Sequence, residues 1–526
     1  VIRNCGHIST EGHTSFGNGT RVAVLNETGG REVPIWDRLT SHMAYIITLY
    51  RHRPSAIAEI ERLIDDYAES VRSDRGEIGS GSYIAGCGTI KNVRIGNGSV
   101  IEDVSRLAEG SVNSSFRDPV YIGNDVIMDH FIICSGSKVN DAAVIDKCFI
   151  GQGCTLSKQY SAENSLFFSN CGGYHGEACS IFAGPYTVTH HKSTLLIAGI
   201  FSFMNAGSGS NQSNHMYKLG PIHQGIMERG SKTTSDSYVL WPSRIGPFTL
   251  VVGRHYHNVD TTQFPFSYLT EVSYESQLIP GINLRSVGTI RDAQKWPKRD
   301  MRKDTKKLDQ INYNLLSPFT VGKMMKGRDL LKKLIDTNHG QEAISFERMR
   351  MKTSAAERGI SLYQMGIEKF IGNSVIKRLE GAGFESDAEI RSRMKPDTDG
   401  GTGDWIDMSG LITPLSSIEE LLASIERKEL KSADAINRSF ENIHKHYYNL
   451  EWTWVYEHLP RETGKPNEEL TAADIIEIVE RWKKSVVDLD RMLYEDARKE
   501  FTLSSMTGFG IDGDDEVKKR DFEQVR

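Results

Sequence analysis

Between Glu77 and Leu156 the chain repeatedly places an aliphatic residue six positions after the last one, often followed by glycine, asparagine or another small residue. An α-helix repeats its faces every 3.6 residues, so a six-residue step excludes a helical stripe. Short strands joined by tight bends fit the step, with one aliphatic side chain of each strand pointing into a narrow core. The step therefore predicts a β-solenoid, and a β-sandwich with short strands is the alternative. The residues that carry the step are Ile95, Ile101 and Leu107, then Ile127, Ile133, Val139 and Ile145, followed after a slip of one by Ile150 and Leu156.

At these positions the chain resembles the left-handed parallel β-helix family of hexapeptide-repeat proteins. That family includes UDP-N-acetylglucosamine acyltransferase, serine acetyltransferase and the acetyltransferase domain of N-acetylglucosamine-1-phosphate uridylyltransferases. The resemblance implies triangular coils of three hexads each, about four of them between Glu77 and Leu156. The irregular repeats and the long helical C-terminal region also look like a bacterial family described as distantly similar to UDP-N-acetylglucosamine pyrophosphorylase. No glycine-rich nucleotide loop follows a strand here, so nucleotidyl transfer is not expected.

The 526 residues are too many for a single compact core. We expect the β-helix domain over residues 1–290, with a helical insertion near 54–73 and a long loop near 198–233. Residues 291–326 are expected as a basic linker, because 291–307 alone contains eight Lys or Arg residues and reads as a solvated connection or surface helix. Residues 327–526 are expected as an all-α domain. Its longest helix carries a heptad-like seam that favours packing within the chain over packing on a second copy.

Charge and cysteine usage describe an ordinary soluble protein of the cytoplasm. The net charge is −6 and 25% of the residues are charged, which excludes a general nucleic-acid binder. No apolar run is long enough to cross a bilayer, so no membrane partner is expected. The seven cysteines contain no CxxC pair and fit small buried side chains in a reducing compartment. Because Val1 lies in strand-like sequence, we expect part of the N-terminus to precede it.

Histidines gather in the second half of the predicted solenoid, where eight of the sixteen lie between positions 130 and 257. The stretch 171–260 holds six basic but only four acidic residues. Imidazoles, amides and cations with few carboxylates favour an anionic small-molecule ligand that bears phosphate, such as a nucleotide-sugar or coenzyme A. The residues predicted to bind this substrate are His190, His191, Asn205, Asn211, Asn214, Lys218, Arg229, Arg254, His255 and His257.

An acyltransferase needs a base that takes a proton from the attacking hydroxyl or amine, and histidine suits this role near neutral pH. His215 and His223 lie in the predicted long loop beside side-chain amides, so both are candidate catalytic residues, with His215 preferred. The resemblance implies acetyl-coenzyme A as the acyl donor and a sugar or nucleotide-sugar as the acceptor. It also implies a homo-oligomer, either a trimer or a dimer.

Two other interpretations remain open. The pairs His190–His191 and His255/His257 have metal-binding spacing, but no carboxylate completes a ligand set, so no metal is predicted. The β-helix also serves as an inert spacer, and the competing function is therefore a non-catalytic nucleotide-sugar-binding or scaffold protein.

Overall fold

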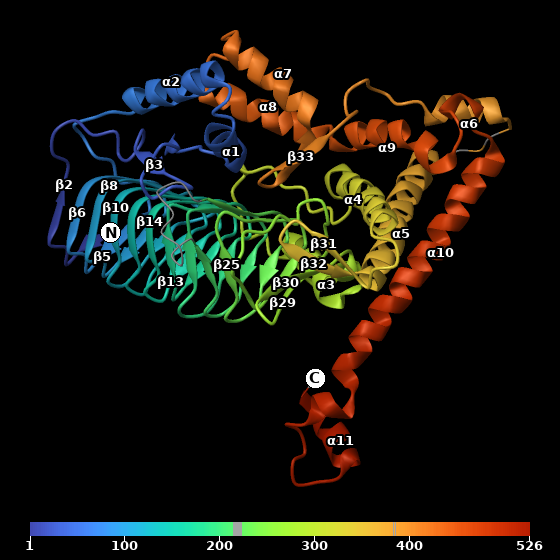
Figure 1. Cartoon of the computed structure of the whole chain (residues 1–526). Helices are drawn as coiled ribbons and strands as arrows, with labels where there is room; N and C mark the ends of the chain where they lie inside the picture. The colour runs from blue at the N-terminus through green and yellow to red at the C-terminus, as the bar shows by residue number, and fades with distance from the viewer. Residues whose placement is uncertain (214–223, 382, 384, 526) are drawn as a thin grey trace.

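Most of the N-terminal half of the chain winds into a parallel β-solenoid, shown in blue to green in Figure 1. The computed structural model describes residues 1–213, 224–381, 383 and 385–525. Within them, two sheets of 15 strands each run along the solenoid. In spatial order, sheet A contains β1 (Ile2–Arg3), β5 (Tyr83–Ala85), β7 (Val100–Glu102), β9 (Tyr121–Ile122), β11 (Lys138–Val139), β13 (Thr155–Ser157), β15 (Gly172–Tyr174), β18 (Val188–Thr189), β21 (Asn205–Ala206), β24 (Lys232–Thr233), β27 (Leu250–Val252), β29 (Tyr268–Val272), β30 (Glu275–Ile279), β32 (Met349–Lys352) and β31 (Ala343–Phe346).

Sheet B supplies the other two faces of the solenoid. Its main path contains β2 (His7–Ser9), β6 (Thr89–Ile95), β8 (Arg106–Asn113), β10 (Ile127–Cys134), β12 (Val144–Ile150), β14 (Ser161–Phe167), β16 (Glu177–Cys179), β19 (Leu195–Ile197), β22 (Asn211–Ser213), β25 (Tyr238–Leu240) and β28 (Arg254–His255). Beside this path lie β17 (Phe182–Ala183), β20 (Gly199–Phe201), β23 (Gly225–Met227) and β26 (Arg244–Ile245). The fold class expected from the repeat, a parallel β-helix, is confirmed.

Each long strand of sheet B bends at one residue in the left-handed region of backbone space. The bend residues have φ between 47° and 56°, and they stack on consecutive coils as Asn92, Glu109, His130, Lys147 and Asn164. The bend divides sheet B into a first face, which precedes it, and a second face, which follows it. With sheet A these two faces give every coil a triangular cross-section.

The bends explain why the six-residue step slips. Ile84, Ile90, Ile95 and Ile101 all point into the core, at steps of six, five and six. The shorter step crosses the bend, and neighbouring coils are therefore 17 residues apart, as the hydrogen bond from Gln152 to Ser135 records. The expectation that Ile127 faces the core was wrong: its side chain is 39% exposed, and the adjacent methionine fills the core position instead.

Residues 198–213 and 224–233, expected as parts of one long loop, continue the solenoid. They contain β20 to β24, each only two or three residues long, with parallel partners on both sides. Strands this short leave glycine, asparagine and serine to form the corners, which made the sequence look like a loop. The helix expected near 54–73 is confirmed as α2 (Pro54–Ser70).

The second face of sheet B is covered by segments from both ends of the chain. An outward column of apolar residues, one per coil, lies on this face: Ile132, Phe149, Leu166, Phe182, Ile200 and Ile226. Strand β3 (Arg21–Ala23) packs directly on this face, and the column shares one hydrophobic core with the hairpin of β3 and β4 (Glu32–Pro34), α1 (Ser41–Leu49), α2, the hairpin β33 (Trp405–Met408) and β34 (Leu411–Pro414), α7 (Leu415–Glu426) and α8 (Ala433–Lys445). Figure 1 shows this cover along one side of the coil stack.

The region after residue 327 is mainly helical, but it also contains two β-hairpins. The hairpin β31–β32 pairs with β30 and so extends sheet A at the end of the solenoid. Sheet A therefore ends at β31 and not at β30. None of the helices in the described residues has both the length and the apolarity to cross a membrane. The remaining helices are α3 (Val287–Lys298), α4 (Pro318–Thr337), α5 (Thr353–Leu379), α6 (Asp387–Met394), α9 (Tyr447–Thr463), α10 (Ala472–Arg498) and α11 (Asp515–Val525), with short 3-10 turns at Ile282–Arg285, Asn467–Glu469, Lys499–Phe501 and Leu503–Met506.

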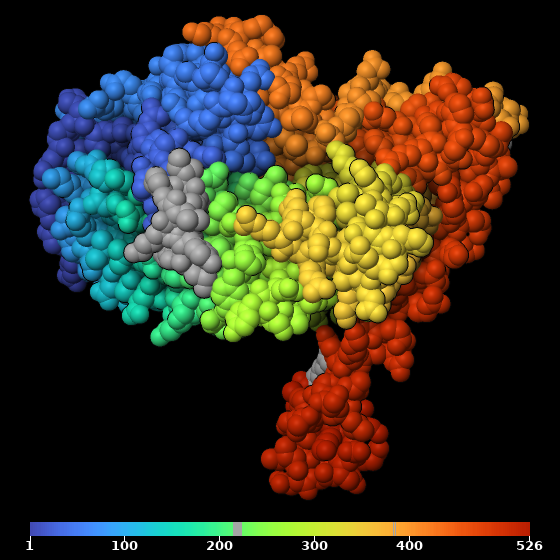
Figure 2. Space-filling view, viewed as in Figure 1, coloured from blue at the N-terminus to red at the C-terminus, as the bar shows by residue number. Residues whose placement is uncertain are grey.

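The long helix α10 packs on α5 of the same chain, as the intramolecular alternative predicted. Trp482 lies against Gly372, and its indole N–H donates to Asn373 at 2.8 Å. Beyond this contact α10 packs on the turn Ile282–Arg285 and on α3, where Asp496 accepts the Val287 N–H at 3.0 Å, and the chain after α10 carries α11 as a protrusion, which Figure 2 shows in red.

The basic stretch 291–307 was expected as a solvated connection or a surface helix, and only its first part, up to Lys298, is a surface helix. Its first part forms α3, and the segment 299–317 then runs between the solenoid and the cover. Arg302 is buried there against Asp300, at 2.8 Å. Asp309 accepts hydrogen bonds from Ser41 of α1 and from Ser169 of the solenoid. Charge counting could not reveal this role, because the partners are distant in sequence.

His42 fixes the meeting point of α1, this segment and the β33–β34 hairpin. Its Nδ1–H donates to the Met408 carbonyl at 3.0 Å, and its Nε2 accepts the Gln310 N–H at 2.9 Å, so the buried ring is neutral. Burial lowers the pKa of His42 below 6.5, although the Asp309 carboxylate opposes this effect.

We expect the free energy of unfolding to fall as the pH is lowered below about 6.5. In this range His42 binds a proton in the unfolded chain but stays neutral in the native protein. The slope from this residue is at most about 1.4 kcal/mol per pH unit. Urea unfolding at several pH values measures it, and His42→Gln should lose this part of the pH dependence. An unchanged slope in that variant would contradict the assignment.

Candidate functional site

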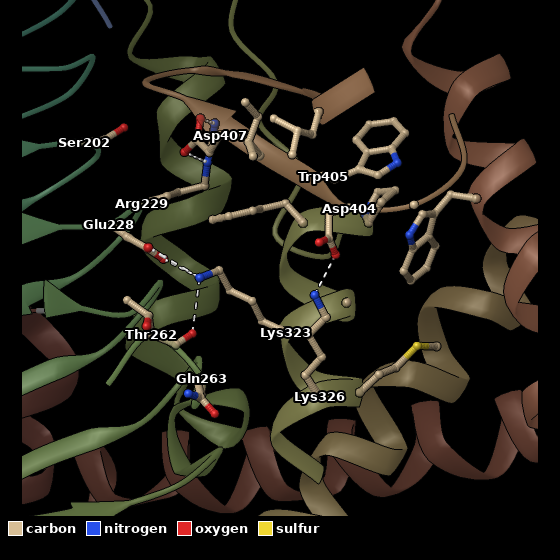
Figure 3. A pocket seen from close by; sticks show the side chains of 18 of the residues that line it. Ser202, Glu228, Arg229, Thr262, Gln263, Lys323, Lys326, Asp404, Trp405 and Asp407 are labelled. Carbon is tan, nitrogen blue, oxygen red and sulfur yellow. Dashed lines mark hydrogen bonds and ion pairs between the residues drawn. The ribbon is translucent and has the colours of Figure 1, made fainter. Parts of the chain in front are cut away.

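A cavity of about 540 Å³ lies where the cover ends and the helical region begins. Its floor is the end of the outward column, with Ile200 and Ile226 followed in register by Arg244. Its walls come from α1, α4, β33 and α9, so segments from four parts of the chain enclose it. We call this space the junction cavity, and Figure 3 shows it from close by.

Arg229 forms one wall of the junction cavity and ties the solenoid to the β33–β34 hairpin. Its guanidinium makes two hydrogen bonds to Asp407, at 2.8 and 3.1 Å, and also donates to the carbonyls of Asn312 and Gly410. The side chain is 0% exposed and lies over the Phe203 ring at 4.2 Å. All three of its nitrogens therefore bind protein atoms, and the pair is a structural junction.

The other cations of the cavity are also paired with carboxylates. Glu228 holds both Lys323, at 3.0 Å, and Arg244, at 3.6 Å. Lys326 of α4 reaches Asp404 beside β33 at 2.6 Å, and Figure 3 shows this contact together with that of Lys323. The pairing leaves little net charge in the cavity.

Three hydroxyl groups of the lining have no hydrogen-bond partner within the described residues. Ser202 and Ser409 are 6% and 2% exposed, and their hydroxyl oxygens are buried without a partner. The Tyr45 hydroxyl likewise has none, and burial raises the pKa of Tyr45 well above 10, so it stays protonated. A buried unpaired hydroxyl costs about 1–3 kcal/mol, which a polar ligand would recover.

His458 offers a basic nitrogen to the same cavity. Its Nδ1 lies 2.9 Å from the Trp454 carbonyl, and because a carbonyl only accepts, the ring proton of the neutral imidazole is on Nδ1. The ring stacks on Trp454 with centroids 4.0 Å apart, which fixes its orientation. Nε2 makes no hydrogen bond to the described residues, and in this neutral tautomer it is the nitrogen that could accept a proton, as a general base requires.

The solenoid spreads the predicted substrate-binding residues over different faces. His190 and His191 are exposed near sheet A, where His190 stacks on Tyr174 at 5.8 Å, and Asn205 is exposed on β21. Arg254 pairs on the surface with Asp236.

The remaining members of the predicted set do not meet these residues. Asn211 is half-buried on β22 and His257 is exposed. His255 is 1% exposed and in register with the core residue Val239, so it lies inside the solenoid. Of the described residues in the predicted set, only Arg229 reaches the junction cavity.

Both predicted catalytic histidines, His215 and His223, lie outside the described residues, as do Asn214 and Lys218. Sequence reasoning missed His458 because it searched the histidine-rich window that ends at position 257. The helix that carries His458 looks like an ordinary amphipathic helix. Its only local signal is the neighbouring cluster of aromatic residues, which includes Trp452 and Trp454.

No metal was predicted, and the described residues contain one group whose ligand atoms lie within 4.8 Å of one another: Asp129, His130 and Asp146. Asp129 is already paired with Arg106 and with the His130 ring. We assign this group to the ion pairs of the solenoid surface.

The model of the family described as Domain of unknown function (DUF4954) matches residues 1–335, and that of Domain of unknown function (DUF6819) matches residues 386–526. The chain is 26% identical over 498 residues to an uncharacterized protein of Treponema pallidum (strain Nichols), covering 86% of this chain and 67% of the relative.

Two solved structures are similar to the chain over about half its length. The UDP-N-acetylglucosamine acyltransferase of Francisella novicida aligns with a TM-score of 0.21 and 12% identity, covering 50% of this chain and 85% of that one. The Arabidopsis UDP-N-acetylglucosamine acyltransferase aligns with a TM-score of 0.20 and 14% identity, covering 52% and 83%.

Proposed function

The chain belongs to the family described as Domain of unknown function (DUF4954), and we propose that it transfers an acetyl group from acetyl-coenzyme A to a sugar-type acceptor in the junction cavity. One observation carries the proposal: His458 lines the cavity, and its Nδ1 is held by the Trp454 carbonyl of its own helix, which leaves Nε2 without a proton when the ring is neutral. The volume of the junction cavity, about 540 Å³, lies within the range of small-molecule pockets, about 300–1,000 Å³.

The reaction follows from this arrangement. His458 Nε2 takes the proton from an acceptor hydroxyl or amine while the acceptor atom attacks the thioester carbonyl. The tetrahedral intermediate collapses with loss of the coenzyme A thiolate, which receives the proton. The acceptor is then acetylated and coenzyme A leaves as the free thiol.

A thiol-release assay tests the proposal. The purified full chain is incubated with acetyl-coenzyme A and a panel of amino sugars, N-acetylated sugars and nucleotide-sugars, and both free thiol and acetylated product are measured. We expect acceptor-dependent thiol release matched by one acetyl group on the acceptor. Saccharide binding without thiol release would instead favour the competing class, a non-catalytic binding or scaffold protein.

A further inference from the structure

The charges of the junction cavity indicate what kind of acceptor it accepts. A phosphate site offers cations that have no carboxylate of their own, as in arginine or lysine clusters. Here a phosphate would have to compete with a carboxylate already in place at every cation. The five cations of the lining each have a carboxylate within 4.0 Å: Arg229, Arg244, Lys323, Lys326 and Arg461.

The groups that do lack partners are uncharged. The hydroxyls of Ser202 and Ser409 are buried without a partner, and each of them, like the Tyr45 hydroxyl of the lining, can both donate and accept a hydrogen bond. A ligand rich in hydroxyl groups satisfies such a set, whereas a phosphate, which only accepts, leaves their acceptor capacity unused. The two serines come from different segments, since Ser202 follows β20 and Ser409 follows β33, and the Ser409 hydroxyl lies against Gly184 on the coil next to Ser202.

Apolar faces complete the recognition surface. Trp405 and Phe319 line the cavity from β33 and α4, and Ile226 lies on the floor. Aromatic and aliphatic faces combined with a few oriented polar groups suit a ring that has one apolar face and a hydroxylated edge. We infer that the acceptor is an uncharged saccharide, and that sugars bearing a phosphate or nucleotide bind more weakly. This inference rests on the proposed function.

Calorimetric titration of the full chain tests the inference with three probes: methyl N-acetylglucosaminide, N-acetylglucosamine 1-phosphate and UDP-N-acetylglucosamine. The methyl glycoside should bind at least about tenfold more tightly than either charged probe. Ser202→Ala and Ser409→Ala should each weaken its binding about threefold to tenfold, the value of one hydrogen bond. Ser361→Ala, on the exposed surface of α5, is the matched control and should bind as the parent does.

The melting temperature separates recognition from a structural role. Ser202→Ala removes a hydroxyl that has no partner, so it should not lower the melting temperature. Tighter binding of a charged probe, no binding of the methyl glycoside, or unchanged affinity in both serine variants would overturn the inference. Selective glycoside binding without any acetyl transfer would sustain it while refuting the proposed transferase, so the two failures are distinguishable.

Discussion

Replacing Arg229 by methionine should lower the free energy of unfolding by about 3–5 kcal/mol, because it leaves the Asp407 carboxylate buried without its partner. The same change removes the hydrogen bonds to the Asn312 and Gly410 carbonyls, which join the 299–317 segment and the hairpin to the solenoid. Urea unfolding followed by tryptophan fluorescence measures the loss, since Trp405 and Trp454 lie beside the junction.

Two further variants show whether the charge pair causes the loss. Arg229→Met combined with Asp407→Leu removes both charges and should recover much of the lost stability, because an apolar pair can replace a buried ion pair. Arg254→Ala breaks the exposed pair with Asp236 and should change stability by less than about 1 kcal/mol. A loss under about 1 kcal/mol in the Arg229→Met variant would show that the junction is dispensable.

Replacing His458 by glutamine should reduce the rate of acetyl transfer about 100-fold or more, the contribution of a positioned general base. Glutamine retains a side-chain amide but cannot take the acceptor proton. The methyl glycoside should still bind within about twofold of the parent, because hydroxyl groups and apolar faces dominate its recognition. Transfer kinetics and calorimetric titration of the same preparation measure both quantities.

The chain offers a closely matched control for this variant. His446 also directs its Nδ1 to the carbonyl four residues earlier, that of Asn442 at 2.8 Å, but it lies on the exposed end of α8 outside the junction cavity. His446→Gln should leave the transfer rate unchanged. If His458→Gln keeps more than half of the parent rate, another group must act as the base.

The solenoid could be predicted from sequence because its signal repeats. Ile84, Ile101 and their equivalents recur with small residues at the corners, so one error, such as the exchange of Ile127 for Met128, leaves the fold class intact. The helix α2 was predictable for the same reason, since Ile57, Ile60 and Ile64 mark one face.

The junction cavity had no such signal. Arg229 and Asp407 are 178 residues apart, and nothing near either residue indicates the other. The sequence around His458 is like that around any other histidine in a helix. Ser202 looks like one more corner residue of the coil. The cavity forms where the segments that cover the solenoid end. Its position depends on how the whole chain packs, and no local sequence pattern indicates it.

The triangular coils have a further consequence for how proteins of this family can diverge. Ile122 follows Ile101 by 21 residues, whereas Val139 follows Ile122 by 17, yet β7, β9 and β11 stay in one continuous ladder. The extra residues leave the stack at a corner and do not disturb the pairing on either side. Loops can therefore be inserted or deleted at the corners during evolution without disturbing the strand pairing of the solenoid. Such insertions can give a family member a new binding specificity.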